Sequence, residues 1–219
     1  MLLKALRQQV LEAGLNMQKD GVARGAQGNI SARDPQSGLV VITPTAIPYE
    51  RLKPGDLCVL DPQRRQVEGP WRPTSELALH MVFYARRADV HAVVHSHAPY
   101  STVFGILLEP LPMALTEAAM LIGGAVPVAA YRRPGSEEVA EVTCAAAGEA
   151  GTAVILANHG LVTVGGDLAR AYETTLAVEN TARLVIMARS TGGRESALSA
   201  EEAAAVRKIY LEKYKPGKA

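Results

Sequence analysis

The feature that most constrains the fold is a series of short apolar runs, rich in β-branched residues, that alternate with helical patterns along the chain. Each of these runs is typical of a β-strand; they lie at 38–43, 57–60, 92–97, 126–128, 154–156 and 161–164. Proline and glycine residues separate many of them, and the last two are joined around Asn158-His159-Gly160. These patterns predict an α/β fold in which helices cover a mixed sheet.

Helical patterns occupy the segments between the predicted strands. Apolar residues recur at helical spacing over 3–17, and the glycine-containing segment 21–25 ends this helix. A second helix is predicted over 76–87, with Thr74 or Ser75 as its N-terminal cap.

Three further helices are predicted towards the C-terminus from their starting residues. Ser136 is followed by two glutamates, which complement the dipole of a helix start. Asp167 is expected to cap a long helix that runs to about residue 190. Ser199 and Glu202 have the spacing of a capping box for the last helix.

Composition restricts the classes of partner. The 219 residues fit one domain, 1–219, and their formal net charge of +1 gives no support for a nucleic-acid partner. No apolar run approaches the roughly 20 residues of a membrane span, and the charged N-terminus does not resemble a signal peptide. Two cysteines, Cys58 and Cys144, are too few for a disulfide framework, so we expect a cytoplasmic protein.

Three histidines form the candidate metal site. His95 and His97 end a predicted strand, where residues two apart point to the same face, so their rings can converge on one ion. His159 lies in the tight Asn-His-Gly turn, and three imidazoles with one open position are typical of catalytic metals. These ligands suit zinc, manganese and cobalt alike. Packed or surface histidines are the alternative, and they are the interpretation that we favour for His80 and His91.

Glu76 is the candidate acid/base, because it begins a helix that follows Pro-Thr-Ser. The alternative is a carboxylate that only complements the helix dipole. Three polar clusters, 28–31, 43–45 and 74–75, offer backbone N–H groups and hydroxyls for an anion, although each alone is typical of a turn. The chain has neither of the common glycine-rich nucleotide-binding motifs.

Taken in order, six segments resemble the class II aldolase/adducin family, and within it the L-fuculose-phosphate aldolases. They are GNIS (28–31), ITPTAIPYERLKPGDL (42–57), PTSELALH (73–80), AVVHSHAPYST (92–102), PVAAYRRPGSEE (127–138) and ANHGLVTVGGDLARA (157–171). The resemblance implies a three-layer α/β/α fold with a central, largely antiparallel sheet. It also implies a homotetramer whose active sites lie at subunit interfaces.

The same resemblance assigns roles residue by residue. It implies that His95, His97 and His159 bind the metal, that Glu76 is both ligand and acid/base, and that the substrate phosphate is held by Asn29, Thr45, Thr74 and Ser75. Ala46 stands where the fuculose enzymes commonly have glycine.

The chain departs from the fuculose aldolases in the segment 115–120, which lacks their tyrosine and carries Glu117 instead. Glu117 resembles the acid/base glutamate of the methylthioribulose-phosphate dehydratases, or it caps a helix after Thr116. A second tyrosine of the family comes from the C-terminal tail of a neighbouring subunit, where Tyr210 and Tyr214 are both candidates.

The expected function is therefore a metal-dependent lyase that reversibly cleaves a ketose 1-phosphate, such as L-fuculose 1-phosphate, to dihydroxyacetone phosphate and a small aldehyde. The alternatives are a sibling aldolase, dehydratase, 4-epimerase or decarboxylase of a related sugar phosphate, and a non-catalytic module like the adducin head domains. The retained histidines and Glu76 argue against the last of these.

Overall fold

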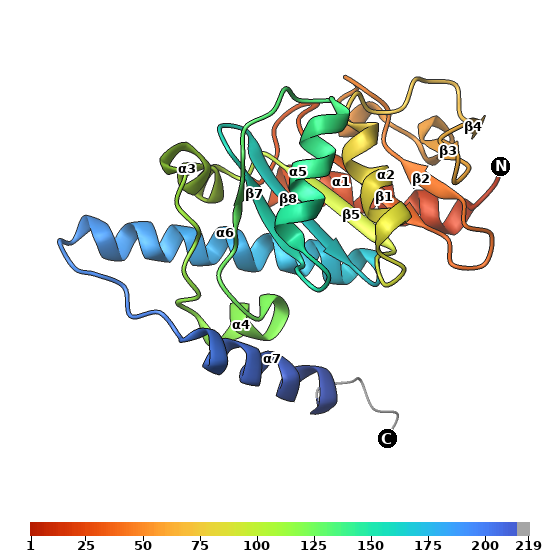
Figure 1. Ribbon diagram of the computed structural model, residues 1–219. Coiled ribbons are helices and arrows are strands. Elements are labelled where there is room, and N and C mark those ends of the chain that lie inside the picture. Colours follow the sequence, from red (N-terminus) through yellow and green to blue (C-terminus); the bar gives the residue numbers. More distant parts are fainter. Residues whose placement is uncertain (214–219) are drawn as a thin grey trace.

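The centre of the molecule is a single eight-stranded sheet with the order β4-β3-β2-β1-β5-β8-β7-β6 (Figure 1), seen in a computed structural model that describes residues 1–213. All neighbouring strands pair antiparallel except β6 and β7, which are parallel. The strands are β1 (Asn29–Arg33), β2 (Val40–Ile42), β3 (Cys58–Leu60), β4 (Gln66–Glu68), β5 (Ala92–Ser96), β6 (Val128–Ala129), β7 (Ala153–Leu156) and β8 (Gly160–Gly165). The predicted α/β class with a largely antiparallel sheet is confirmed.

Helices cover both faces of the sheet and make three layers (Figure 1). Helices α1 (Lys4–Lys19), α3 (Pro99–Leu107) and α6 (Leu168–Ser190) pack on one face, and α2 (Leu77–Arg86) and α5 (Glu137–Ala147) pack on the other. Helices α4 (Thr116–Ile122) and α7 (Ala200–Lys213) pack together beside α6. Within residues 1–213, no helix combines the length and apolar character needed to cross a bilayer.

The side chains of the central strands alternate between the two faces. On β5, Val94 belongs to the core under α1 and α6, whereas Val93 belongs to the core under α2 and α5. On β8, Leu161 and Val162 divide in the same way. This period of two explains why these strands read as continuous apolar runs, because both of their faces are buried.

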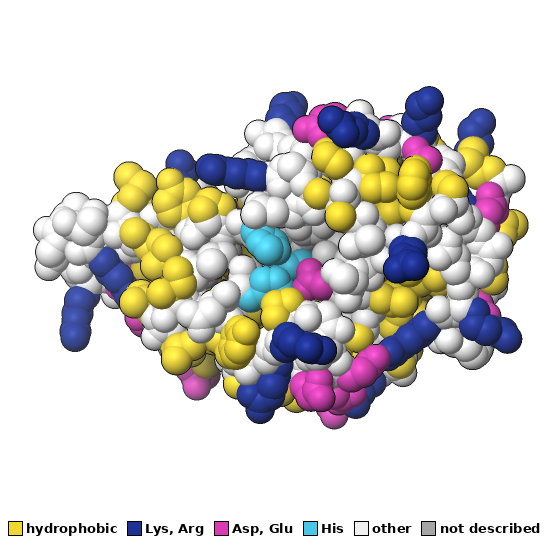
Figure 2. All heavy atoms as spheres, turned by 90° about the horizontal axis from the view of Figure 1, so that it is seen from above, with side chains coloured by type: hydrophobic (Ala, Val, Ile, Leu, Met, Phe, Trp, Pro, Cys, Tyr) yellow, Lys and Arg dark blue, Asp and Glu magenta, His cyan; other side chains and the backbone are white. Residues whose placement is uncertain are grey.

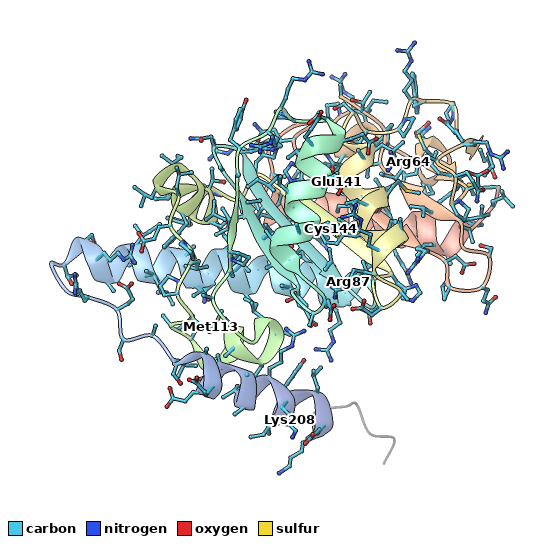
Figure 3. The ribbon with its side chains drawn as sticks, in the orientation of Figure 1. Arg64, Arg87, Met113, Glu141, Cys144 and Lys208 are labelled. Carbon is cyan, nitrogen blue, oxygen red and sulfur yellow. The ribbon has the colours of Figure 1, made fainter. Side chains whose placement is uncertain are left out.

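Helices α2 and α5 are joined by polar contacts as well as by their apolar faces (Figure 3). Arg86, the last residue of α2, forms an ion pair with Glu141 in the middle of α5. Arg87, at the C-terminal end of α2, donates to the carbonyl oxygens of Gly148 and Gly151, just beyond α5. Cys58 and Cys144 are buried free thiols.

The helix starts predicted in the C-terminal half are confirmed. Ser136 Oγ accepts a hydrogen bond from the backbone of Val139, and Asp167 accepts one from Arg170. Ser199 and Glu202 make both hydrogen bonds of a capping box.

Two local predictions were wrong. The segment 28–31 is not a turn, because β1 begins at Asn29 and pairs on both sides; Gly28, just before the strand, has a left-handed backbone with φ of 74°. Neither Thr74 nor Ser75 occupies the cap of α2, which is Glu76 itself with no side-chain cap; the Thr74 hydroxyl instead accepts a hydrogen bond from the Glu76 backbone.

Candidate metal centre

His95 and His97 are positioned by the middle of the sheet. Strand β5 lies between β1 and β8, and His95 faces Asn29 on one neighbour and Val162 on the other. Gly28 lets β1 approach this end of β5, since a Cβ atom there would lie 2.7 Å from the carbonyl oxygen of His95. The three strands therefore hold the His-Ser-His segment on a rigid support.

His159 reaches the same place from the turn between β7 and β8. Asn158 adopts the left-handed conformation, with φ of 55°, and Gly160 packs so closely that an added Cβ would lie 2.4 Å from the carbonyl oxygen of Ser96. The ring centroids of His95, His97 and His159 lie 4.8–5.1 Å apart. The turn thus completes a triangle of imidazoles.

Glu76, at the start of α2, closes the group. Its Oε2 atom lies 3.1 Å from Nε2 of His95, and its Oε1 atom lies 3.5 Å from Nε2 of His159. One ligand atom from each of Glu76, His95, His97 and His159 lies within 4.8 Å of all the others. In the view from above, histidine side chains gather in a hollow near the middle of the surface, with an acidic side chain beside them (Figure 2).

The hydrogen-bond acceptors of this cluster face one another, as expected for a site that binds a cation. His95 Nδ1 is 3.1 Å from the carbonyl oxygen of Leu161 and must donate to it, so a neutral ring has its lone pair on Nε2. That lone pair faces Oε2 of Glu76, which is also an acceptor. Nε2 of His95 and Oε1 of Glu76 are buried with no hydrogen-bond partner among the described residues, and Nε2 of His159 lies 3.5 Å from that Oε1 atom. Acceptors that converge in this way need a proton or a metal ion between them.

Burial and neighbouring charges set the ionisation of the cluster. Burial, together with the charge of His95, lowers the pKa of both His97 and His159 to about 4. Burial opposes ionisation of Glu76, but His95, the Asn29 amide and His159 outweigh it, and the pKa of this carboxyl is lowered. Near neutral pH the site therefore offers neutral His97 and His159 and a carboxylate, which are the forms that bind divalent metals.

A cavity of about 250 Å³ opens beside the cluster and collects the predicted anion-binding residues. Its lining includes three members of the cluster, Glu76, His97 and His159, together with Asn29, Thr45, Ala46, Thr74 and Ser75. Backbone hydrogen bonds hold the segments 43–45 and 72–74 side by side. The N–H of Thr45 donates to the carbonyl oxygen of Arg72, and the N–H of Thr74 donates to that of Thr43. No lysine or arginine lines the part of this cavity that the structure describes.

The hydrogen bonds between these two segments decide which of their donor groups are available to an anion. The N–H groups of Thr45 and Thr74 are already used between the two segments, so their hydroxyls are the groups left to donate. Ala46 has φ of 57°, in the left-handed region that favours glycine. A glycine would adopt this backbone conformation at lower cost than the alanine that stands here.

Residues 8–186 match the family described as the class II aldolase and adducin N-terminal domain. The chain belongs to the class II aldolase/adducin family. This chain is 35% identical over 210 residues to L-fuculose phosphate aldolase of Escherichia coli strain K12, covering 96% of this chain and 94% of the relative. It is 32% identical over 192 residues to 5-deoxy-D-ribulose 1-phosphate aldolase of Bacillus thuringiensis serovar kurstaki, with 88% and 89% covered.

A solved structure of L-fuculose 1-phosphate aldolase has the same fold, with a TM-score of 0.91 and 31% identity over 96% of this chain and 98% of that one. The relatives in the class II aldolase/adducin family also include an L-ribulose-5-phosphate 4-epimerase of Salmonella paratyphi B.

Several predicted residues of this class II aldolase family member do not reach the cavity within one chain. Glu117 is exposed on α4, whose C-terminal end lies near the start of β7, whereas His159 follows the end of that strand (Figure 1). Tyr210 hydrogen-bonds to Arg170 and stacks under its guanidinium. Tyr214 lies outside the described residues. His91 precedes β5, at the opposite end from His95 and His97.

His80 is a packed histidine, which is the interpretation that the sequence favoured, and its hydrogen bonds reach a residue of the cavity. This side chain is completely buried in α2, and burial with the nearby His95 lowers its pKa to about 3, so it is neutral. Its ring hydrogen-bonds to both Asn29 and Ser31. The available signal was its position four residues after Glu76, which places both on one helical face.

Proposed function

We propose that this protein is a metal-dependent aldolase that cleaves a ketose 1-phosphate to dihydroxyacetone phosphate and a small aldehyde. The observation that carries the proposal is the unpartnered Oε1 atom of Glu76, which lies among three imidazoles at the side of a cavity rich in hydroxyls. A base, a metal-ligand set and an anion-binding rim thus meet in one place.

The named substrates of the relatives support this class of substrate. L-fuculose phosphate and 5-deoxy-D-ribulose 1-phosphate are both ketose phosphates. Cleaving the C3–C4 bond of a ketose 1-phosphate leaves negative charge next to the C2 carbonyl, and a divalent ion held by His95, His97 and His159 supplies Lewis-acid stabilisation of that charge.

Glu76 is the residue proposed to move the proton at C3. Its Oε2 atom is held by the Asn29 amide at 2.9 Å, whereas Oε1 has no hydrogen-bond partner. The pKa of Glu76 is lowered, so this side chain is a carboxylate at neutral pH. It is proposed to accept a proton from C3 in the synthetic direction and, once protonated, to return it after cleavage.

The hydroxyls of Thr45, Thr74 and Ser75 are proposed to hold the phosphate, with the Asn29 amide beside them. Among residues 1–213, no lysine or arginine lines the cavity, so hydroxyl and amide donors, rather than a basic field, would fix the anion. Binding the phosphate away from the reacting carbons supplies positioning energy for the cleavage step.

Incubation of the metal-loaded protein with dihydroxyacetone phosphate and an aldehyde tests the proposal. Lactaldehyde of either hand, glycolaldehyde and acetaldehyde should be tried, and a ketose phosphate is expected with at least one of them. Absence of product with all four, from protein shown to contain stoichiometric metal, would contradict aldol chemistry.

A sibling reaction is the second candidate, and Glu117 is the observation that favours it. A carboxylate stands where the fuculose aldolases have tyrosine, and the relatives include an epimerase. Glu117 is exposed and away from the cavity of its own chain, so it would have to act from a neighbouring subunit. The Glu117→Gln variant separates the two: loss of activity as large as in Glu76→Gln favours two carboxylates in proton transfer, and retained activity favours Glu76 alone.

The proposal has three further parts. The resident metal is zinc, with manganese and cobalt as alternatives. The protein is a homotetramer with active sites at its subunit interfaces, and it is cytoplasmic. The buried free thiols of Cys58 and Cys144 are consistent with a reducing compartment. Elemental analysis and sedimentation equilibrium of the purified protein measure the metal and the assembly.

A further inference from the structure

A line of buried polar side chains runs from the interior of α2 to the candidate acid/base. Tyr84 Oη lies 2.7 Å from Ser31 Oγ, which lies 2.7 Å from Nδ1 of His80. Nε2 of His80 lies 2.5 Å from Oδ1 of Asn29, whose Nδ2 donates to Oε2 of Glu76 at 2.9 Å. All five residues are at least nine-tenths buried.

The direction of every hydrogen bond follows from the carboxylate at the end. An ionised Glu76 only accepts, so the Asn29 NH₂ group faces it and the amide oxygen faces His80. His80 is neutral and must donate from Nε2 to that oxygen, which leaves Nδ1 as an acceptor for the Ser31 hydroxyl. Ser31 in turn accepts from the hydroxyl of Tyr84. Each proton has one permitted position.

We propose that His80 is a positioning residue for Glu76, acting through Asn29. This inference rests on the proposed function, in which Glu76 moves the substrate proton. The two ends of an amide have the same shape, so only hydrogen bonding keeps the donor end of Asn29 towards the carboxylate. His80 fixes that choice from the far side, and Asn29 then holds Oε2 so that Oε1 stays directed at the imidazole cluster.

The arrangement also differs from ordinary packing. Both ring nitrogens of His80 form hydrogen bonds, and both partners lie on β1 rather than on α2, the helix that carries His80. The residue ties α2 to β1 and thereby fixes two segments that both reach the cavity, at Asn29 and at Glu76.

Three variants test the role. His80→Phe keeps a flat ring and removes both hydrogen bonds, whereas the amide of His80→Gln can still donate to Asn29. Thr143→Val is the matched control, because it alters a buried polar residue of the same layer, on α5, that bonds only to its own helix. Rates of ketose phosphate cleavage, and of deuterium exchange at C3 of dihydroxyacetone phosphate, are measured per folded, metal-loaded site.

We expect His80→Phe to lower kcat and the exchange rate by about 10–100-fold and to weaken zinc affinity about 10-fold, as changes behind a metal ligand do. His80→Gln should recover kcat to within a few-fold, and Thr143→Val should retain the wild-type values. Wild-type kcat per site in His80→Phe, or no recovery in His80→Gln, would overturn the inference.

A spectroscopic readout keeps the inference open to refutation if His80→Phe does not fold. In ¹⁵N-histidine NMR of the wild-type protein, the His80 signal, assigned by its loss in His80→Gln, should show the neutral Nε2–H tautomer. An Nδ1–H tautomer or a cation would overturn the chain of donors. If the wild-type protein neither cleaves a ketose phosphate nor exchanges the C3 proton, the proposed function fails, while the tautomer and the zinc affinity still decide the positioning role.

Discussion

Nε2 of His95 lies 3.1 Å from Oε2 of Glu76, and the other ring nitrogen of His95 is committed to the carbonyl oxygen of Leu161. His95 is completely buried, so water cannot solvate the two facing acceptors. The pair is therefore stable when a cation lies between the two atoms. Of the four clustered side chains, completely buried His95 therefore has the strongest need for a bound cation.

This relationship predicts that His95→Ala loses the metal. We expect the affinity for zinc to fall by more than the roughly 10–100-fold that changes behind a ligand cause. The variant should also lose the stabilisation that metal gives, about 2.7 kcal/mol at a free metal concentration of 100 times Kd. Competition with a chromophoric chelator and thermal unfolding with and without zinc measure the two effects.

His91→Ala is the control for that experiment. His91 precedes the same strand but lies at its other end, so its removal should leave zinc affinity unchanged. Equal loss of zinc in the two variants would contradict the assignment of His95 as a ligand.

Acid should destabilise the metal-free protein in a defined window. Burial first, with the charge of His95, lowers the pKa of His97 and His159 to about 4 in the folded state, against about 6.5 in an unfolded chain. Between these values the unfolded state binds more protons, so the free energy of unfolding is highest above pH 6.5 and falls as the pH drops towards 4. Urea unfolding in chelator at pH 7, 6 and 5 measures this slope.

The variant His159→Gln, which lacks one of the two titrating rings, should show a shallower slope over the same range of pH. A free energy of unfolding that is constant between pH 7 and 5 in the wild-type protein would contradict the lowered pKa values.

Ala46→Gly should stabilise the protein. The left-handed conformation of Ala46, with φ of 57°, costs a non-glycine residue about 1–2 kcal/mol, whereas glycine loses about 0.5–1 kcal/mol through greater freedom in the unfolded chain. We expect a net gain of about 0.5–1 kcal/mol, measured by urea unfolding. Ala26→Gly is the control, because Ala26 lines the same cavity without a positive φ and should be destabilised by the same change.

Gly160→Ala should displace the segment that carries two of the proposed metal ligands, His95 and His97. An added Cβ would lie 2.4 Å from the carbonyl oxygen of Ser96 and 3.3 Å from Cε1 of His95, so β8 must move away from β5. We expect zinc affinity to fall at least about 10-fold. Gly124→Ala, where an added Cβ meets nothing within 4 Å, should bind zinc as the wild type does. Similar affinities in both variants would show that the close approach is unimportant.

Local sequence patterns predicted the parts of the site that depend on local geometry. His95 and His97 follow from the two-residue period of a strand, and the place of His159 follows from a tight turn between two strands. The meeting of Glu76 with the histidines depends on the order β1-β5-β8, which joins segments far apart in the chain, and only the family resemblance supplied it.

Elements held by distant contacts escaped prediction. The N-terminus of α3 is capped by Glu179, whose carboxylate accepts hydrogen bonds from the backbones of Tyr100 and Ser101, nearly eighty residues earlier in the chain. No local pattern reveals such a cap. Strand β1 does alternate, with apolar Ile30 and Ala32 between polar neighbours, but it is only five residues long and follows a glycine that favours a turn. Pairing with β2 and β5 on its two sides makes this segment a strand.

The placement of the ligands on β5, before α2 and after β7 has a consequence for folding kinetics. A metal ion can join Glu76 to His159 only after the middle of the sheet has closed, because the chain between them includes the four helices α2 to α5 and the three strands β5 to β7. Contacts of such long range form late, so the ion should act mainly on the rate at which the native protein opens rather than on the rate at which it forms. Loading with metal would then lengthen the lifetime of the folded state while leaving the refolding rate nearly constant.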